Sequence, residues 1–225
     1  MPETVTHPSA TVVLLRDSAQ GMQTLLLLRN KKVRFGGGEW VFPGGKIEPA
    51  ELAAHDALDD AERAAAVREC HEEAGIVLSP AALQKYSHWI TPDIMPQRFS
   101  TGFYLVALEH EPDIVIDNSE IVDYRWLSPG EALQQHGRGE LAMMPPTFVS
   151  LCDLASYAAP GDILQRCAAT VPPLFEPRVV REETGVCLLY AGDCGYDAID
   201  STLQGKRHRL LMRASCYEYI CELTE

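Results

Sequence analysis

The sequence predicts an α/β fold that is followed by a smaller α+β extension at the C-terminus. The main reasons are the order of strand-like and helix-like runs, a three-glycine break ahead of a Gly-Gly turn, and a run of helix formers that ends at a glycine. Strands are expected at residues 10–16, 23–29, 40–42, 86–90, 101–108 and 123–127. Helices are expected at residues 60–74, 129–136 and 147–157. The elements therefore begin in the order β-β-β-α-β-β-β-α.

Turn and cap signals bound the individual elements. The polar turn 17–21 joins the first two strands as a hairpin. Glycines 36–38 break the chain before the third strand, which leads into the Gly-Gly turn. Ser128 begins a capping-box pattern, with proline at the first helical position, that opens the second helix. The third helix has apolar residues at helical spacing, namely Phe148, Leu151, Leu154 and Ala155.

Residues 159–225 exceed this arrangement and are expected to form a C-terminal extension packed on a domain of residues 8–158. The expected strands of the extension are at residues 178–181, 186–190, 210–212 and 216–221, and the first two form a hairpin. Residues 192–193 and 208–209 carry Asp, His and Arg. A structural turn and a charge at a sheet edge explain these two pairs better than a role in a functional site.

A cluster of carboxylates is the strongest functional signal. At about 100° per residue, Glu73 and Glu72 lie about 40° and 60° to either side of Glu69, so the three side chains share one helix face. Mg²⁺ and Mn²⁺ prefer such oxygen ligands. A Glu-rich face that stands alone is more often a solvated surface. Here Arg68, Gly75 and the upstream Gly-Gly turn accompany the glutamates, which favours a metal site.

These residues resemble the Nudix box, G-x5-E-x7-R-E-U-x-E-E-x-G-U, in which U is a bulky aliphatic residue. Residues 68–76 match every fixed position of its second half except one, where Cys70 replaces the aliphatic residue. The resemblance implies a Nudix α/β/α sandwich with a mixed β-sheet. It also implies a hydrolase that uses Mg²⁺ or Mn²⁺ to cleave a nucleoside diphosphate linked to another moiety.

The resemblance assigns roles to individual residues. The implied catalytic residues are Arg68, Glu69, Glu72, Glu73 and Glu120. The three helix glutamates are the implied metal ligands, and Arg68 orients a carboxylate. Glu120 precedes a late strand and is the candidate for a further acid. Gly44 and Gly45 are implied to let the backbone approach phosphate or metal closely.

The spacer between the Gly-Gly turn and the arginine has 22 residues, nine more than the 13 of the consensus. Counting forward from the turn places the first acidic residue of the box at Glu51, and counting back from the arginine places it at Asp60. Both assignments stay open. Asp59 and Glu62 form a capping-box pattern, so we expect the helix to begin near Asp60 with Asp59 as its N-cap. Residues 50–58 then form a loop or an added turn.

The helix face away from the carboxylates is expected to pack on the sheet. This face carries Val67, Cys70 and Ala74, flanked by Ala64 and His71. For Cys70 and His71, packing in the core is therefore favoured over a chemical role.

A finer resemblance lies upstream. Coenzyme A diphosphatases of the family carry L-L-T-x-R-[SA]-x3-R-x3-G-x3-F-P-G-G, and this chain has Arg29, Arg34 and Gly38 at the same spacings before F-P-G-G. Leu27 and Asn30 depart from the motif. The chain thus resembles the peroxisomal coenzyme A diphosphatase branch and its bacterial relatives. This implies coenzyme A or acyl-coenzyme A as the substrate, with Arg29 and Arg34 binding its phosphates; a solvated basic turn is the alternative.

Two other functions stay open. The first is a hydrolase of ADP-ribose, NADH or nucleotide sugars. The second, from a different class, is a non-catalytic regulator with the Nudix fold that binds a nucleotide. The complete set of box glutamates disfavours the regulator, because binding alone does not require every metal ligand.

Composition limits the partners. The formal charge of −13 disfavours nucleic acid, because a polyanion needs a basic stripe. Residues 29–34 carry four cations, a local exception that suits a small anionic substrate. No apolar run reaches the roughly 18 residues of a membrane span, no secretory signal is visible, and the seven cysteines lack a C-x-x-C pair. We therefore expect a cytoplasmic protein whose partner is a small nucleoside diphosphate derivative, with no nucleic acid and no membrane, and leave a homodimer open.

Overall fold

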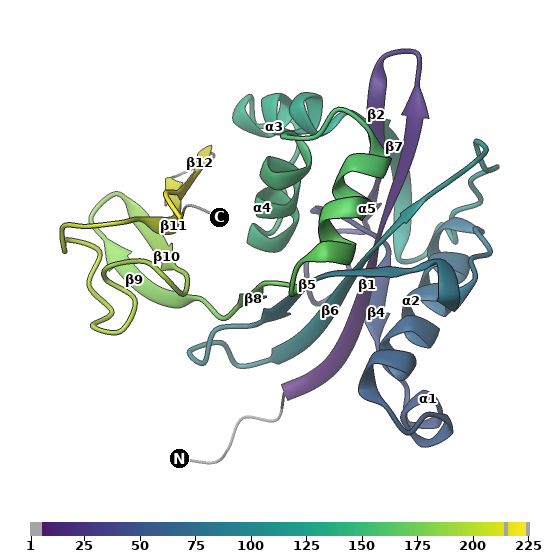
Figure 1. Ribbon diagram of the computed structural model, residues 1–225, viewed down its shortest axis with the longest axis horizontal. Helices are drawn as coiled ribbons and strands as arrows, with labels where there is room; N and C mark the ends of the chain where they lie inside the picture. The colour runs from purple at the N-terminus through teal and green to yellow at the C-terminus, as the bar shows by residue number, and fades with distance from the viewer. Residues whose placement is uncertain (1–5, 214–215, 224–225) are drawn as a thin grey trace.

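The computed structural model describes residues 6–213 and 216–223, and within them an eight-stranded sheet forms the centre of the molecule (Figure 1). Its strands are β1 (Thr6–Ser18), β2 (Gly21–Arg29), β3 (Trp40–Val41), β4 (Gly44–Lys46), β5 (Gln84–Ile90), β6 (Arg98–Ala107), β7 (Ile121–Leu127) and β8 (Leu174–Phe175). The main path runs β3-β2-β1-β6-β5-β8, while β4 pairs with β1 and β7 with β2. The pairs β1–β6 and β5–β8 are parallel and the other strand pairs antiparallel, which confirms a mixed sheet.

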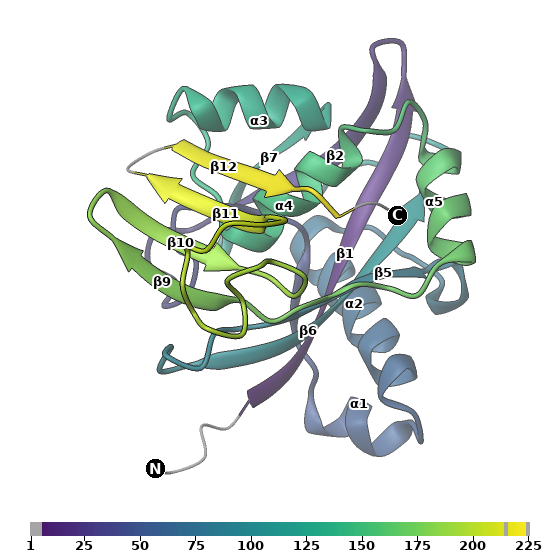
Figure 2. The same ribbon diagram turned by 60° about the vertical axis from the view of Figure 1, so that its left-hand side comes forward.

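Helices cover both faces of this sheet (Figures 1 and 2). They are α1 (Pro49–Ala54), α2 (Leu58–Ala74), α3 (Pro129–Gly137), α4 (Pro145–Leu154) and α5 (Pro160–Ala169), with a short 3₁₀ helix η1 at Pro80–Ala82. β1 shows how the two layers arise, because successive strand residues point to opposite faces. Val12 and Leu14 join the buried cluster that contains α2, whereas Val13 and Leu15 join the cluster that contains α4 and α5. The predicted α/β/α layering is confirmed.

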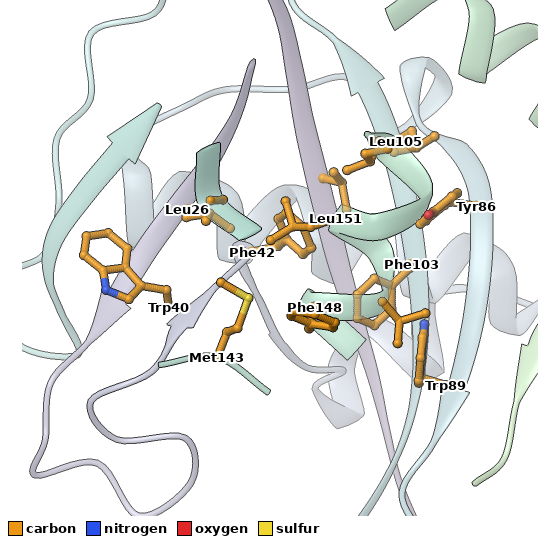
Figure 3. Close-up of a cluster of buried hydrophobic side chains, with 14 of the residues drawn as sticks. Leu26, Trp40, Phe42, Tyr86, Trp89, Phe103, Leu105, Met143, Phe148 and Leu151 are labelled. Atoms are coloured by element: carbon orange, nitrogen blue, oxygen red, sulfur yellow. The ribbon is translucent and has the colours of Figure 1, made fainter. Parts of the chain in front are cut away.

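The larger core lies between the sheet and α4 (Figure 3). Leu26, Phe42 and Phe103 face Phe148 and Leu151 of α4 in this cluster, and all five side chains are buried. Burying a Leu or Phe side chain stabilises a fold by about 1.5–3 kcal/mol. The helical spacing of Phe148, Leu151 and Leu154 in the sequence therefore reflects one packed face, as predicted. α4 ends at Leu154 and Ala155 is exposed, so the prediction that the helix continues to residue 157 with Ala155 on this face is wrong.

The chain beyond α4 adds α5, β8 and a second sheet. The second sheet contains β9 (Arg178–Glu182), β10 (Gly185–Leu189), β11 (His208–Arg213) and β12 (Cys216–Cys221), in the antiparallel order β12-β11-β10-β9. The predicted hairpin and both later strands are confirmed. α5 and β8 were not predicted, and β8 extends the main sheet by pairing with β5. The domain boundary after residue 158 stays a prediction.

The helix that carries the glutamates begins earlier than predicted. α2 starts at Leu58 with Ala57 as its N-cap, so Asp59 lies inside the first turn and the prediction that it caps the helix is wrong. The Asp59 carboxylate is engaged elsewhere, because it accepts hydrogen bonds from Arg63 Nε and Tyr104 Oη, each at 2.7 Å. The extra residues form α1, which agrees with the added turn that was expected ahead of the long helix.

The small side chains of α2 pack on the sheet. Cys70 and Ala74 are fully buried and Val67 packs against the same cluster, as predicted. His71 is exposed, so the prediction that it belongs to the core is wrong. The buried stripe also includes Ala61 and Ala65, which rotates the contact face away from position 71. Gly75 ends the helix in the left-handed conformation, with φ at 73°, as its sequence position indicated.

Among the described helices, none is both long enough and apolar enough to cross a membrane.

Candidate active site

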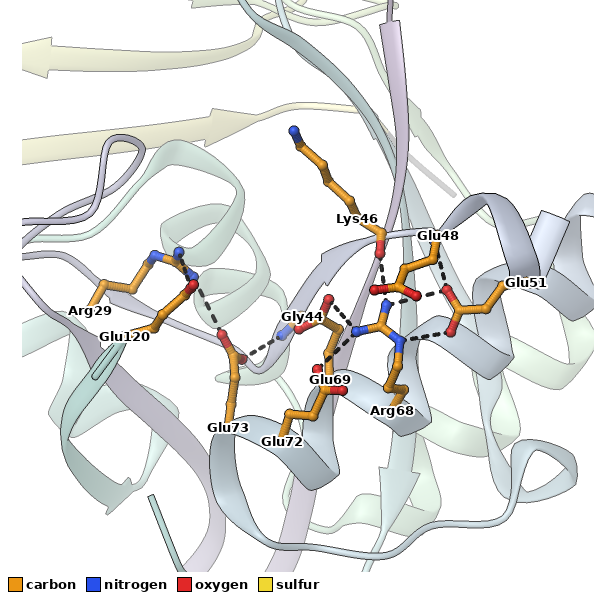
Figure 4. Close-up of polar contacts among 10 residues, drawn as sticks. All are labelled: Arg29, Gly44, Lys46, Glu48, Glu51, Arg68, Glu69, Glu72, Glu73 and Glu120. Atoms are coloured by element: carbon orange, nitrogen blue, oxygen red, sulfur yellow. Dashed lines mark hydrogen bonds and ion pairs between the residues drawn. The ribbon is translucent and has the colours of Figure 1, made fainter. Parts of the chain in front are cut away.

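Four segments bring the predicted residues together (Figure 4). α2 supplies the glutamates and Arg68, and the turn that contains β4 places Gly44 and Gly45 beside them. Arg29 ends β2 and is paired in register with Ile121 of β7, so Glu120 lies next to Arg29. Residues that are up to 91 positions apart in the chain thus form one site, and one ion pair joins Arg29 to Glu120 at 3.2 Å.

Glu73 is the most buried carboxylate of this site, with 6% of the residue exposed. Its Oε2 accepts a hydrogen bond from the Gly44 N–H at 2.9 Å, and its Oε1 lies 3.4 Å from Arg29 Nη1. Burial raises the pKa of Glu73 to about 8, and these two contacts offset the effect only in part. The carboxylates of Glu69 and Glu120 raise this pKa further. The site therefore groups more carboxyl groups than cations around a buried glutamate.

Arg68 binds three carboxylates at once. It donates to Glu69 at 2.8 Å and to Glu72 at 2.9 Å, and both of these glutamates follow it on α2. It also donates two hydrogen bonds to Glu51 of α1, at 2.9 and 3.2 Å. Of the two candidates for the first acidic position, Glu51 lies in this cluster, whereas Asp60 is exposed. A fork of guanidinium donors fits carboxylate pairs well, which suits an orienting role for Arg68.

The two glycines of the turn leave room for the carboxylates. A Cβ atom at position 45 would overlap the Glu69 carboxylate, and one at position 44 would clash with Ala10 and Thr11 of β1. β4 pairs with β1 at these positions, which holds the turn in place. The turn therefore requires glycine, and its backbone lies directly against a candidate metal ligand.

The two arginines that were expected to bind substrate phosphates occupy different places. Arg29 contacts Glu73 and Glu120 inside the cluster. Arg34 is exposed and lines a shallow cavity of about 190 Å³ together with Phe35 and residues 95–97. The sequence reading did not single out Phe35, although a large aromatic residue beside a basic segment is a usable signal.

The rim of the site includes two further residues that the sequence reading missed. Lys46 Nζ lies 5.7 Å from the centre of the Phe99 ring, and the Phe99 ring lies 5.0 Å from that of Phe35. The backbone carbonyl of Lys46 accepts a hydrogen bond from Arg68 at 2.9 Å. A cation and two aromatic rings therefore border the carboxylate cluster on the side of Arg34.

The donor set fits hard divalent cations. Five carboxylates, those of Glu51, Glu69, Glu72, Glu73 and Glu120, stand against two guanidinium groups, which leaves three formal negative charges. In the described part of the chain no three His, Cys, Asp or Glu side chains enclose a ready metal site, and Arg29 and Arg68 contact the carboxylates instead. Burial raises the pKa of Glu69 although Arg68 opposes the shift. Oxygen donors that are short of positive charge suit Mg²⁺ or Mn²⁺.

Comparison with known proteins agrees with this geometry. The NUDIX domain family model matches residues 5–145. Putative nudix hydrolase 7 of Caenorhabditis elegans is 27% identical over 210 residues, which cover 77% of this chain and 70% of that protein. Acyl-coenzyme A diphosphatase NUDT19 of Homo sapiens is 32% identical over 117 residues, or 50% of this chain and 31% of that protein. The same enzyme from Gallus gallus is 30% identical over 159 residues, which cover 68% of this chain and 42% of that protein. The chain thus matches less than half the length of these two diphosphatases.

Solved structures show the same fold. The crystal structure of a NUDIX hydrolase from Alicyclobacillus acidocaldarius aligns with a TM-score of 0.65 and 23% identity, and covers 75% of this chain and 98% of that one. The NUDIX domain of Shewanella oneidensis NrtR, solved with ADP ribose, aligns with a TM-score of 0.50 and 18% identity over 68% and 88% of the two chains. At such identities the likeness concerns the fold alone.

Proposed function

The chain belongs to the Nudix family, and on this basis we propose that it is a metal-dependent diphosphatase acting on coenzyme A or an acyl-coenzyme A. The reaction is hydrolysis of the diphosphate that links a nucleoside to another moiety. The observation that carries the proposal is the surplus of carboxylates around the buried Glu73, which lies against the Gly-Gly turn. A group of carboxylates that outnumbers its cations favours a ligand that supplies positive charge.

In this proposal the residues of the cluster have different roles. Mg²⁺ or Mn²⁺, when bound, activates water and neutralises the diphosphate. Glu69, Glu72 and Glu73 hold the metal. Arg68 keeps Glu69 and Glu72 oriented through its two hydrogen bonds to them. Glu120 is the candidate for a further acid, and Arg29 holds it next to Glu73.

Three observations support coenzyme A as the substrate. Arg29, Arg34 and Gly38 keep the spacing of the coenzyme A diphosphatase motif. Two of the relatives, which are 30% and 32% identical, are named acyl-coenzyme A diphosphatases. Arg34 also presents an exposed cation in a cavity at the rim of the site, where it can reach a phosphate. ADP-ribose, NADH and nucleotide sugars are the alternative substrates.

A panel of diphosphates incubated with the pure protein and Mg²⁺ or Mn²⁺ tests the proposal. We expect coenzyme A to be cleaved to 3′,5′-ADP and 4′-phosphopantetheine with a higher kcat/KM than dephospho-coenzyme A. Loss of a charge-assisted contact costs about 1.5–3 kcal/mol, or roughly 10- to 150-fold. Arg34→Ala should therefore remove most of the preference for the 3′-phosphate, while Lys32→Ala on the same exposed segment serves as the control.

Two results would contradict parts of this proposal. Equal rates on coenzyme A and its dephospho form, or a preference for ADP-ribose, NADH or a nucleotide sugar, would reject the substrate and leave the diphosphatase chemistry intact. Tight binding of nucleotides without turnover of any diphosphate would favour a non-catalytic regulator.

A further inference from the structure

A second cavity lies where the C-terminal sheet meets the rest of the molecule. It has a volume of about 160 Å³, and its polar lining comes from Glu39 ahead of β3, His136 of α3 and Tyr217 of β12. The Trp40 N–H donates to the Ala142 carbonyl at 2.7 Å, which fixes the α3–α4 connection against β3. Three separate segments, one of them from the extension, therefore build its walls.

His136 lines the cavity and has one ring nitrogen whose partner is not among the described residues. Its Nδ1 lies 2.8 Å from the Leu141 carbonyl oxygen, which can only accept, so Nδ1 carries the proton in the neutral ring. Nε2 is then left with a lone pair. The His136 residue is 5% exposed, and its buried Nε2 has no hydrogen-bond partner among the described residues. Buried polar atoms in native proteins usually have a partner, and a buried water can supply it.

Glu39 and Tyr217 extend the polar lining. Within the described residues neither side chain forms a hydrogen bond or ion pair, although burial raises the pKa of both. The charge of Glu39 raises the pKa of Tyr217 further, so the two groups interact. The Tyr217 ring packs against His136 at 4.6 Å and against Phe148 at 5.3 Å, which leaves it poorly suited to stack on a base. The cavity thus combines acceptors with no cation in its lining.

One arginine connects this cavity to the carboxylate cluster. The Arg29 N–H donates to the Glu39 carbonyl at 3.0 Å, so the two residues are backbone neighbours. A Cβ atom at Gly36 would lie 3.4 Å from Glu39 Oε2 and 3.5 Å from Arg29 Cδ. The guanidinium group of the same Arg29 reaches Glu73 and Glu120. Glu39 of the cavity lining therefore lies beside the arginine that contacts the carboxylate cluster.

We infer that this cavity binds the part of the substrate that the diphosphate joins to the nucleoside. This part is an uncharged arm, like that of coenzyme A, whose amide N–H and hydroxyl groups donate hydrogen bonds. The inference rests on the proposed function. The Glu39 carboxylate in the lining attracts N–H and O–H donors and repels phosphate. The nucleoside end fits the other cavity better, because Phe35 is 37% exposed there beside the cation of Arg34. The extension would then contribute Tyr217 to substrate binding.

Binding of the two reaction products separates the two ends of the substrate. Isothermal titration in Mg²⁺ would measure Kd for 4′-phosphopantetheine, which carries the arm, and for 3′,5′-ADP, which carries the nucleoside. We expect Glu39→Gln to weaken 4′-phosphopantetheine about tenfold and to change 3′,5′-ADP less than about twofold, because a charge-assisted hydrogen bond is lost only at the arm. Tyr217→Phe should act in the same direction. Glu183→Gln, on the exposed turn between β9 and β10, is the control.

Three outcomes would overturn the inference. The first is unchanged binding of 4′-phosphopantetheine in both variants, and the second is no measurable binding of it by the wild type. The third is a selective loss of 3′,5′-ADP affinity, which would place the nucleoside in this cavity. A wild type that hydrolyses coenzyme A while showing any of these results retains the proposed function. If the wild type hydrolyses no diphosphate, the proposed function itself is rejected.

Discussion

The carboxylate cluster and the C-terminal sheet each bury an acidic side chain beside an arginine, with opposite results. Asp193 accepts hydrogen bonds from Arg209 on both oxygens, each at 2.7 Å, and from the backbone N–H groups of Gly195 and His208, each at 2.8 Å. Burial alone would raise its pKa, but these four bonds outweigh burial and lower it. In the cluster, burial raises the pKa of Glu73 to about 8.

Burial acts on both carboxylates, and the number of hydrogen-bond donors that oppose it separates the two sites. Glu62, on the same helix as Glu73, is also buried, and it is matched by Lys85 and by the Tyr104 hydroxyl. Asp193 and Glu62 are therefore paired within the fold. Glu73 shares Arg29 with Glu120 and lies near further glutamates. A buried carboxylate that the fold leaves short of positive charge is the feature that indicates a ligand site.

The largest expected effect is a loss of stability when the balanced ion pair of Asp193 and Arg209 is broken. Asp193→Asn leaves the buried Arg209 without its counter-charge, and breaking a buried ion pair in this way costs about 3–5 kcal/mol. The free energy of unfolding, measured in urea, should fall by that amount, while kcat per folded molecule should change little. Asp197→Asn, an exposed neighbour, is the matched control. A variant as stable as the wild type would show that the pair contributes no net stability.

The next effect is expected in the cluster, and it is on rate rather than stability. Glu73→Gln removes a proposed metal ligand and should lower kcat at least about 10²-fold. The melting temperature in EDTA should not fall, because an amide can still accept the Gly44 N–H without a buried charge. Glu109→Gln, an exposed site, is the control. Full activity of Glu73→Gln, or turnover by the wild type in excess EDTA, would reject the mechanism.

A smaller difference should separate the two candidates for the first acidic position. Glu51 holds Arg68 through two hydrogen bonds, so Glu51→Gln should lower kcat/KM about tenfold through misplaced carboxylates. Asp60→Asn should stay within about twofold of the wild type, because Asp60 is exposed on α2. Steady-state kinetics on both variants decides the assignment, and a larger loss in Asp60→Asn would reverse it.

The smallest expected effect is on how the stability contributed by Asp193 depends on pH. The pKa of Asp193 is lower in the folded state than its ordinary value of 3.8, so its contribution to stability is present above that value and is lost as the pH falls through the folded pKa. The stability gap between the wild type and Asp193→Asn should therefore narrow on acidification below about pH 4. Urea unfolding at several pH values measures this gap. A gap that widens in acid would contradict the lowered pKa.

Much of this arrangement follows from local sequence patterns. The period of 3.6 residues places Glu69, Glu72 and Glu73 on one face of α2. Runs of β-favouring residues between turn signals predict most strands of both sheets, but not β4, which was expected as part of the Gly-Gly turn. β8 escaped prediction because it has only two residues and exists through its pairing with β5. α5 begins at Pro160 and is as long as the predicted α4, so its length does not explain why it was missed. Only Pro160, Ile163 and Cys167 are buried on it, which makes its apolar face sparse.

Contacts between distant segments lie outside such patterns. The choice between Glu51 and Asp60 depends on how the inserted helix α1 folds back on Arg68. The contact of Arg29 with Glu73 joins residues 44 positions apart. Arg209 was expected as a charge at a sheet edge, but that prediction is wrong, because Arg209 is buried in β11, an inner strand of the second sheet. The turn expected around Asp193 is present.

The short strand β8 also covers the edge of the main sheet at β5. Its Phe175 ring stacks on the indole of Trp89 with centroids 4.1 Å apart and planes within 6°. A protein truncated after residue 158 would lose this cover, expose Trp89 and leave the hydrogen-bonding groups of the β5 edge unpaired. Free strand edges with apolar side chains are templates for aggregation. We therefore expect the truncated protein to aggregate more readily than the full chain, which light scattering at equal concentrations would measure.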